Sequence, residues 1–300
     1  MKRSFTLLAL IVVSLGSGVR GWSQLGMFTR EQRIELTREW KGERFEDGRP
    51  KVSDEMLKRM ATVDAEEAWG VLMGHGFINQ FEGHWHVINP GPRLEARVVT
   101  AVFMPVRPDV NAVINEHGKA EKRVGAQNSW IIDILQPGDI LVADLFGKVK
   151  DGTLIGDNLG TSIYTKSHTG LIVDGAVRDE TGISQIEGFR VYTRDVDPSA
   201  LRNVMLVGIN VPIRIGHATV MPGDVAVTDV EGVTFVPPQL CEEVADHAEL
   251  IHLVDEWGHS MLRQQKYTPG EIDGKWTHRM IEEFNQFCAS KGSRQRMKEE

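Results

Sequence analysis

The stretch that decides the fold is GDNLGTSIYTKSHTGLIVDGAVRD, residues 156–179. It predicts a helix that begins at Asp157 and ends near the turn His168-Thr169-Gly170. A short apolar strand, Leu171–Val173, is expected to follow this turn. Functional groups of α/β folds gather at the carboxyl ends of such strands, so the residues after it are candidate site residues.

Arg178 and Asp179 end this strand. Neighbouring residues of a strand point to opposite faces, so the backbone must leave regular strand geometry if both side chains are to serve one site. Gly175 supplies the conformational freedom for such a corner. The sequence therefore predicts a glycine corner that brings Arg178 and Asp179 together.

The residue types at this corner suit a small anion and a metal ion. The first N–H groups of the helix after Gly156 have no partner inside the helix, so they can hold a carboxylate or a phosphate. Arg178 offers a planar fork for an oxo-acid, and Asp179 offers a hard oxygen ligand for Mg²⁺ or Mn²⁺. In a plainer interpretation Asp157 is only the N-cap, and Arg178 and Asp179 form a surface ion pair. Spacing alone leaves both interpretations open.

The first residues have the pattern of a targeting segment. Lys2 and Arg3 precede an apolar run, Phe5–Leu15, that is too short to span a bilayer comfortably. We expect residues 1–23 to be a secretory signal peptide, cut within residues 18–24. The alternative is an uncleaved anchor. Cleavage predicts a secreted or periplasmic protein with no stable membrane insertion.

The charge balance argues against nucleic acid as a partner. The formal net charge is −8, and loss of Lys2, Arg3 and Arg20 with the signal peptide brings it to about −11. Nothing in such a chain offsets the repulsion from phosphates.

Length and cysteine content indicate one large domain, or one domain with long terminal additions. With 300 residues, 41% of them hydrophobic, the chain can bury a normal core. Cys241 and Cys288 are far apart in the sequence. A disulfide between them is possible, but they form neither a disulfide framework nor a metal-ligand spacing.

Residues 24–76 are polar and have helical patterning. Helix start signals of the capping kind occur at Thr29, Ser53 and Asp64. We expect a helical extension that packs on the outside of the main domain. Its many charges favour a solvated cover, and a partner-binding role stays open.

The next segment has strand patterns and several histidines. Strands are expected at residues 87–88 and 96–106, with short helices at 109–117 and 129–135. His84 and His86 alternate on one strand face with His75 nearby, which is a conceivable zinc pair. No third ligand is obvious, so packing beside Trp85 is the more ordinary role.

A repeated phrase marks the architecture. Pro137–Asp144 is PGDILVAD and Pro222–Asp229 is PGDVAVTD, and each predicts a tight turn that delivers a buried strand. Two unrelated turns would not explain the matching strands and final aspartates. We therefore expect both strands in one layered domain, with residues 156–179 between them.

Residues 77–265 resemble the RraA-like family. The matching phrases are Gly138–Asp144, Gly156–Leu159, Val173–Asp179 and Pro222–Asp224 with Asp229–Val233. The family includes class II pyruvate aldolases that act on 4-hydroxy-4-methyl-2-oxoglutarate and 4-carboxy-4-hydroxy-2-oxoadipate, and also proteins named regulators of ribonuclease activity. The aldolase signature is an aspartate, twenty intervening residues and Arg-Asp, and Asp157 with Arg178–Asp179 satisfies it.

The resemblance implies an α/β fold, a swivelling β/β/α domain assembled as trimers or pairs of trimers with the site between subunits. The expected organisation is a signal peptide (1–23), an N-terminal helical extension (24–76), an RraA-like domain (77–265) and a C-terminal helical extension (266–300).

The resemblance also implies roles for individual residues in catalysis. Asp179 is implied to bind the divalent metal, Mg²⁺ or Mn²⁺, and Arg178 to hold the C2 oxygen of the oxo-acid. Asp157 is implied to orient water at the metal or to move a proton. In the aldolases a glutamate of the neighbouring subunit completes the site, and Glu256 stands at the best matching position.

The substrate carboxylate is implied to bind at the helix start, at Gly156 and the backbone N–H groups of Asn158 and Leu159. The chain departs from the family pattern in residues 180–210, which are longer than usual and add Arg190, Arg194 and Arg202. This loop is expected to reshape the pocket. His217 replaces a common glycine, and we interpret it as a structural substitution.

Three functions follow. The first is a metal-dependent lyase that releases pyruvate from a 4-hydroxy-2-oxo acid and also decarboxylates oxaloacetate. The second is a non-catalytic binding ring like the ribonuclease regulators. The third is a lyase for a sugar-derived oxo-acid, which the added arginines would suit.

Overall fold

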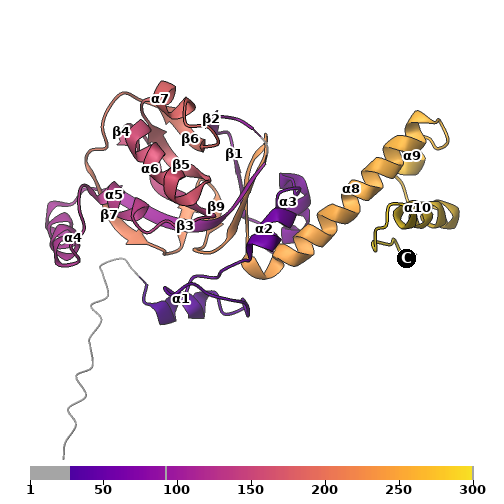
Figure 1. Ribbon diagram of the computed structural model, residues 1–300, viewed down its shortest axis with the longest axis horizontal. Coiled ribbons are helices and arrows are strands. Elements are labelled where there is room, and N and C mark those ends of the chain that lie inside the picture. Colours follow the sequence, from indigo (N-terminus) through magenta and orange to yellow (C-terminus); the bar gives the residue numbers. More distant parts are fainter. Residues whose placement is uncertain (1–27, 92, 299–300) are drawn as a thin grey trace, which may run out of the picture.

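The computed structural model describes residues 28–91 and 93–298 (Figure 1). The predicted signal peptide lies outside this part of the chain. Within these two ranges no helix combines the length and the apolar character that a membrane span requires.

The helical segments and strands alternate in the middle of the chain. The helices are α1 (Arg30–Leu36), α2 (Asp54–Met60), α3 (Ala65–Gly74), α4 (Pro108–Ala120), α5 (Gln127–Ile132), α6 (Asp157–Ser167), α7 (Glu180–Ser184), the 3₁₀ turn η1 (Pro238–Leu240), α8 (Cys241–Arg263), α9 (Pro269–Ile272) and α10 (His278–Ser290). The strands are β1 (Phe81–Gly83), β2 (His86–Ile88), β3 (Leu94–Pro105), β4 (Asp139–Thr153), β5 (Gly170–Val177), β6 (Arg190–Val196), β7 (Val204–Ile209), β8 (Ile213–Ile215), β9 (Ala218–Val220), β10 (Val225–Thr228) and β11 (Gly232–Val236).

Four parallel strands form the centre of the main sheet. Its order is β1-β11-β10-β3-β4-β5-β6-β2, and β7 also pairs with β3. Strands β3 to β6 are parallel to one another, whereas the strands outside them are antiparallel. Parallel strands require crossover connections, and here the crossovers carry α4 to α7. The predicted α/β class is confirmed.

The sheet separates two apolar clusters. Leu171 and Val173 of β5 pack in the cluster beneath α4, α5, α6 and α7, whereas Ile172 packs in the cluster beneath the β8–β9 hairpin. This alternation follows from the two-residue period of a strand buried on both faces. In Figure 1 helices α5, α6 and α7 lie over one face of the central strands.

The three predicted helix starts in the N-terminal extension are confirmed. The side chains of Thr29, Ser53 and Asp64 each accept a hydrogen bond from the backbone N–H three residues later. Helices α2 and α3 share an apolar cluster with β10 and α8. These helices therefore share a core with the main sheet.

The N-terminal extension is also held to the main domain by buried arginines. The expectation that its charges are solvated is therefore only partly correct. Arg49 donates to both carboxylate oxygens of Asp139, at 3.0 and 3.2 Å, and both side chains are buried. Arg33 is buried as well, and its Nε donates to the backbone oxygen of Asn210 at 3.1 Å. Burial lowers the pKa of Arg33.

The two Pro-Gly-Asp turns have the same internal hydrogen bonds, as the repeated phrase predicts. The N–H of Asp139 donates to the Gln136 oxygen, and its carboxylate accepts from the Gln136 N–H. Asp224 makes the same pair of bonds with Met221. The strands that follow both turns pair with β3, which places the turns side by side.

Helix α8 carries the chain away from the sheet to α9 and α10 (Figure 1). There Trp257 of α8 packs with Trp276 and Phe284, the two tryptophan rings being 4.6 Å apart between centroids. Cys241 and Cys288 are both buried free thiols, so the possible disulfide is absent.

Candidate active site

Two backbone segments meet where β5 ends, and this meeting creates the site. The N–H of Leu154 donates to the Ala176 oxygen at 2.8 Å, and the N–H of Arg178 donates to the Ile155 oxygen at 3.0 Å. The chain that enters α6 therefore runs beside the chain that leaves β5. This pairing brings Gly156 and Asp157 next to Arg178 and Asp179.

Helix α6 begins and ends where the sequence predicts. Gly156 is its N-cap, with no side-chain capping bond, so backbone N–H groups of the first turn stay available. At the other end His168 has a left-handed conformation with φ of 57°, which closes the helix before β5.

The corner that unites Arg178 and Asp179 lies at Asp179, and not at the predicted Gly175. Asp179 has φ of 57° and ψ of 41°, in the left-handed region, which turns the chain out of the strand. Gly175 has no such conformation and lies inside β5, where the register with β4 and with β6 shifts. A Cβ there would approach the Leu145 Cβ to 2.8 Å, so the glycine permits close packing of β4 on β5.

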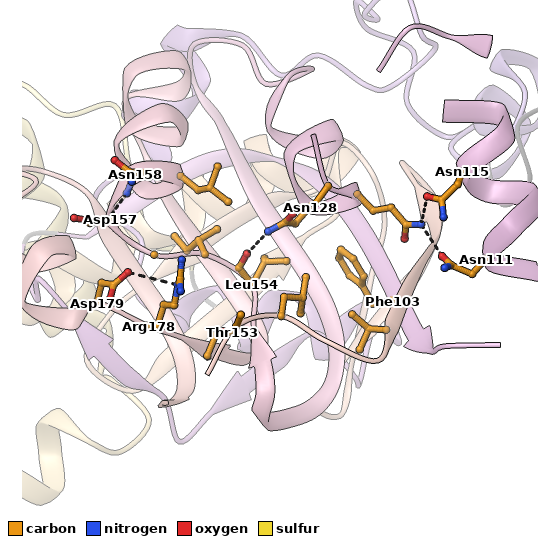
Figure 2. Close-up of a pocket in the computed structure, with 18 residues that line it drawn as sticks. Phe103, Asn111, Asn115, Asn128, Thr153, Leu154, Asp157, Asn158, Arg178 and Asp179 are labelled. Carbon is orange, nitrogen blue, oxygen red and sulfur yellow. Dashed lines mark hydrogen bonds and ion pairs between the residues drawn. The ribbon is translucent and has the colours of Figure 1, made fainter. Parts of the chain in front are cut away.

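The left-handed turn places both charged side chains on one side of the chain (Figure 2). Asp179 Oδ2 lies 3.5 Å from Arg178 Nε, and the two side chains are 48% and 46% exposed. Asp179 is the N-cap of α7, yet its carboxylate makes no capping bond there. Gly156 lies against both, since a Cβ on it would be 2.3 Å from Asp179 Oδ2.

Asp157 lies at the same place but is already hydrogen-bonded. Its Oδ1 accepts from the Asn158 N–H at 2.7 Å, so this N–H is free for a substrate carboxylate only if Asp157 turns away. The N–H of Leu159 has no hydrogen-bond partner among the described residues. Gly182 of α7 confines Asp157, because a Cβ on Gly182 would be 2.8 Å from the Asp157 Cβ.

These residues form one end of an elongated cavity of about 470 Å³, which we call the site cavity. Figure 2 shows Arg178 and Asp179 at this end, and Phe103, Asn111 and Asn115 at the other. The structure thus brings together the predicted residues Gly156, Asp157, Asn158, Leu159, Arg178 and Asp179. Among the described residues that line it, Arg178 is the only cation.

Four amide side chains that the sequence does not point to line the cavity beyond these residues, together with apolar side chains such as Phe103. Asn111 and Asn115 belong to α4, and Gln127 and Asn128 belong to α5. We call them the carboxamide cluster. Their one signal in the sequence is the density of amides in two expected helices, and no motif connects them with the Arg-Asp pair.

Hard oxygen donors at the site suit Mg²⁺ or Mn²⁺. Asp157 and Asp179 both line the site cavity, and Asp179 is free of a capping bond. Mg²⁺ is commonly held by one or two carboxylates, with water and substrate oxygens completing its shell, so Asp179 with the second carboxylate nearby fits it. Within the described residues no group of three or more His, Cys, Asp or Glu side chains could form a complete protein cage.

Other predicted ligands lie elsewhere. Glu256 is on α8 and pairs with Lys291, remote from the site cavity of its own chain. Because it was expected to act in a neighbouring subunit, its role stays a prediction. His84 has φ of 59° and lies outside β2, so it does not alternate with His86, which contacts Glu180 instead.

The added arginines of residues 180–210 do not reach the site cavity, contrary to expectation. Arg194 lies on the opposite face of the sheet, where it binds Asp174 at 2.6 Å and Glu82 at 2.7 Å. Arg190 and Arg202 are also absent from the cavity lining. The segment instead contributes the small and apolar side chains Ala200, Leu201 and Val204. The backbone N–H of His217 donates to Glu82, a bond that a glycine could also make, and the structural role of the imidazole stays a prediction.

The fold and the site together define an α/β protein with an acid–arginine site at the end of a parallel strand. The profile of the RraA-like family, described as Aldolase/RraA, matches residues 60–235. The chain belongs to the RraA-like family.

Individual relatives agree with this assignment. A protein of Halalkalibacterium halodurans named "Putative 4-hydroxy-4-methyl-2-oxoglutarate aldolase" is 33% identical over 120 residues, which cover 40% of this chain and 56% of the relative. The chain thus spans about half the length of curated relatives that it matches.

Solved structures show the same fold. RraAS2 of Streptomyces coelicolor, described as an unusual member of the RNase ES inhibitor RraA family, has a TM-score of 0.58 at 23% identity, covering 70% of this chain and 96% of that chain. An uncharacterized protein from Pseudomonas syringae pv. tomato has a TM-score of 0.60 at 20% identity, covering 75% and 100%.

Proposed function

We propose that this protein is a divalent-metal-dependent lyase that cleaves a C–C bond of a 4-hydroxy-2-oxo acid and releases pyruvate. The observation that carries the proposal is the meeting of Asp157, Arg178, Asp179 and the start of α6 in one cavity. Family membership and the name of the Halalkalibacterium relative support it. Substrate, metal dependence and assembly are all part of the proposal.

The start of α6 and Arg178 would bind the 2-oxo acid end of the substrate. The Leu159 N–H lies at the helix N-terminus, where partial positive charge favours a carboxylate. Arg178 would donate to the C2 oxygen. Its guanidinium contacts Asp179 through Nε, and no hydrogen bond of its terminal nitrogens is seen among the described residues, so these can stabilise the negative charge that this oxygen gains.

Cleavage requires a base for the proton of the C4 hydroxyl. As the C3–C4 bond breaks, its electron pair forms the enolate of pyruvate, and C4 becomes a carbonyl when its hydroxyl loses the proton. Asp157, directly or through water, is the group placed to take this proton. The same enolate arises from decarboxylation of oxaloacetate, so this reaction belongs to the proposal. No lysine lines the site cavity among the described residues, and the proposal therefore involves no Schiff base.

Asp179 would hold Mg²⁺ or Mn²⁺, and Asp157 would orient water at the ion or take the proton. When bound, the ion supplies positive charge that stabilises the developing enolate. Glu256 of a neighbouring copy remains our candidate for a further ligand, in a homotrimer or homohexamer. Export after removal of residues 1–23, to the periplasm or the medium, is likewise proposed.

Pyruvate release from 4-hydroxy-2-oxo acids and from oxaloacetate tests the proposal. We expect release with Mg²⁺ or Mn²⁺, loss with EDTA and recovery when the metal is restored. Arg178→Ala and Asp179→Ala should each abolish release. Arg107 and Asp109 form an exposed Arg–Asp pair outside the site cavity, so Arg107→Ala and Asp109→Ala are matched controls that should retain it. Absence of release with every substrate and metal would instead favour a non-catalytic binding ring.

A further inference from the structure

The carboxamide cluster has a fixed hydrogen-bond orientation. The Leu206 N–H can only donate, and it donates to Gln127 Oε1 at 2.7 Å. Gln127 must therefore present its Nε2, which donates to Asn111 Oδ1 at 2.8 Å and to Asn115 Oδ1 at 3.0 Å. The backbone thus determines which way all three amides face.

This orientation leaves two donors and one acceptor for a ligand. With their oxygens bound to Gln127, Asn111 and Asn115 retain their Nδ2 groups, which have no hydrogen-bond partner among the described residues. Asn128 is fixed in the opposite sense, because its Nδ2 donates to the Leu154 oxygen at 2.7 Å. Its Oδ1 remains an acceptor, and Figure 2 shows Asn128 between Arg178 and the two α4 asparagines.

The charge of the site cavity discriminates between possible leaving fragments. Its one cation among the described lining residues, Arg178, is at the 2-oxo acid end in the proposed binding mode. A second carboxylate at the carboxamide end would lose hydration without gaining a cation, and it could only accept hydrogen bonds. Hydroxyl groups donate and accept, so they match both the Nδ2 groups and Asn128 Oδ1.

We propose that the substrate is a monocarboxylic 3-deoxy-2-oxo acid with a hydroxylated chain, and that the carboxamide cluster binds its hydroxyls. This inference rests on the proposed lyase function and specifies the fragment that leaves. In the reaction the C3–C4 bond breaks, the C4 hydroxyl gives its proton to a base, and C3 of the resulting enolate takes up a proton. The products are pyruvate and a hydroxyaldehyde.

Two six-carbon substrates test the inference. They are 4,5,6-trihydroxy-2-oxohexanoate and 4,5-dihydroxy-2-oxohexanedioate of the same configuration, which differ only in whether C6 is hydroxymethyl or carboxylate. We expect kcat/KM for the hydroxymethyl compound to be about tenfold higher or more, because a desolvated charge without a partner is disfavoured. A higher kcat/KM for the dicarboxylate would overturn the inference.

An added cation should shift this preference. Asn115→Lys places an ammonium group at the carboxamide end, so the ratio of the two kcat/KM values should move toward the dicarboxylate by about tenfold. Ala112→Lys adds the same charge to an exposed position of α4 outside the cavity lining and should leave the ratio unchanged. Thermal unfolding of both variants checks that they are folded. If Asn115→Lys is folded and the ratio is unchanged, the carboxamide cluster does not bind the substrate and the inference is overturned.

Exchange of the pyruvate methyl protons with D₂O separates this inference from the lyase function. Exchange requires enolate formation but no leaving fragment, and it is followed by NMR. If exchange depends on the metal and kcat/KM is higher for the dicarboxylate, the lyase function stands and the proposed substrate class is wrong. Absence of exchange and of cleavage would overturn both.

Discussion

Asp179 Oδ2 lies 3.5 Å from Nε of Arg178, the residue directly before it, because Asp179 has a left-handed backbone conformation. In a regular strand the two side chains would point to opposite faces of the sheet. The single left-handed residue therefore brings together the cation of the site and the carboxylate that we propose as its metal ligand.

Replacing Arg178 by lysine tests the need for a planar fork. Lys keeps the charge but binds as a point charge and cannot contact two oxygens in parallel. We expect Arg178→Lys to lower kcat/KM for pyruvate release by about 100-fold, by analogy with the loss of one oxyanion-stabilising donor. Steady-state kinetics at saturating metal measure this. Arg107→Lys in the exposed pair is the control, and equal rates for Arg178→Lys and the wild type would show that charge alone suffices.

Gly156→Ala should damage the site more than the fold. The new Cβ would meet Asp179 Oδ2 at 2.3 Å and Arg178 Nε at 3.2 Å, so both flexible side chains must move away. We expect kcat/KM to fall by at least about tenfold, since misplacement of catalytic groups is costly. Gly70→Ala in α3 introduces a Cβ with no atom within 4 Å. It should keep full activity and unfold at a slightly higher temperature, because alanine favours helix. Equal activities for the two variants would contradict the geometry.

The buried Arg49–Asp139 pair should be important for stability. Arg49→Met leaves a buried carboxylate without its cation, and loss of one partner of a buried pair costs about 3–5 kcal/mol. Urea unfolding monitored by circular dichroism gives this difference. Lys51→Met removes the cation of the exposed Lys51–Glu43 pair and should cost no more than about 1 kcal/mol. Similar losses for both variants would mean that the buried pair contributes little.

Asp224 should make stability depend on pH in the opposite direction to a salt-bridged carboxylate. Burial raises the pKa of Asp224 to about 8, whereas its ordinary value is 3.8. The folded state therefore retains a proton that the unfolded chain has lost. This contribution to stability is complete below the unfolded pKa and declines as pH rises through this window to the folded pKa.

Asp224→Asn removes this titration while keeping an oxygen that can accept from the Met221 N–H. Relative to the wild type, the variant should gain thermal stability as the pH is raised from about 4 to about 8, by on the order of a few kcal/mol in total. Scans of thermal unfolding at several pH values measure the difference. Asp133→Asn at an exposed position is the control. A difference that is constant with pH would refute the raised pKa.

The sequence predicts best those features that depend on neighbouring residues. Capping residues located the starts of α1, α2 and α3, and residues 156–170 located α6, because a helix end requires particular local donors and acceptors. The repeated Pro-Gly-Asp phrase predicted two equivalent turns for the same reason. The position of Arg178 and Asp179 directly after an apolar strand was predictable in the same way.

Features that depend on distant partners were missed. The charge of Arg49 was visible, but its buried partner Asp139 is 90 residues away, so a solvated surface was the natural expectation. The carboxamide cluster comes from the crossover between β3 and β4, and only the sheet order places it beside the end of β5. The sequence does not show which face of β6 a residue occupies, so it does not reveal that Arg194 points to the face opposite the site cavity.

The left-handed conformation of Asp179 also restricts which amino acids could ever be recovered at this position. Asparagine and glycine tolerate it, whereas β-branched and bulky residues are disfavoured there whatever their chemistry. In a saturation library at codon 179, residues that disfavour a positive φ would therefore be lost because of the backbone conformation, before their chemistry matters. Asp179→Asn would be the informative survivor, since the amide keeps the turn and loses the negative charge.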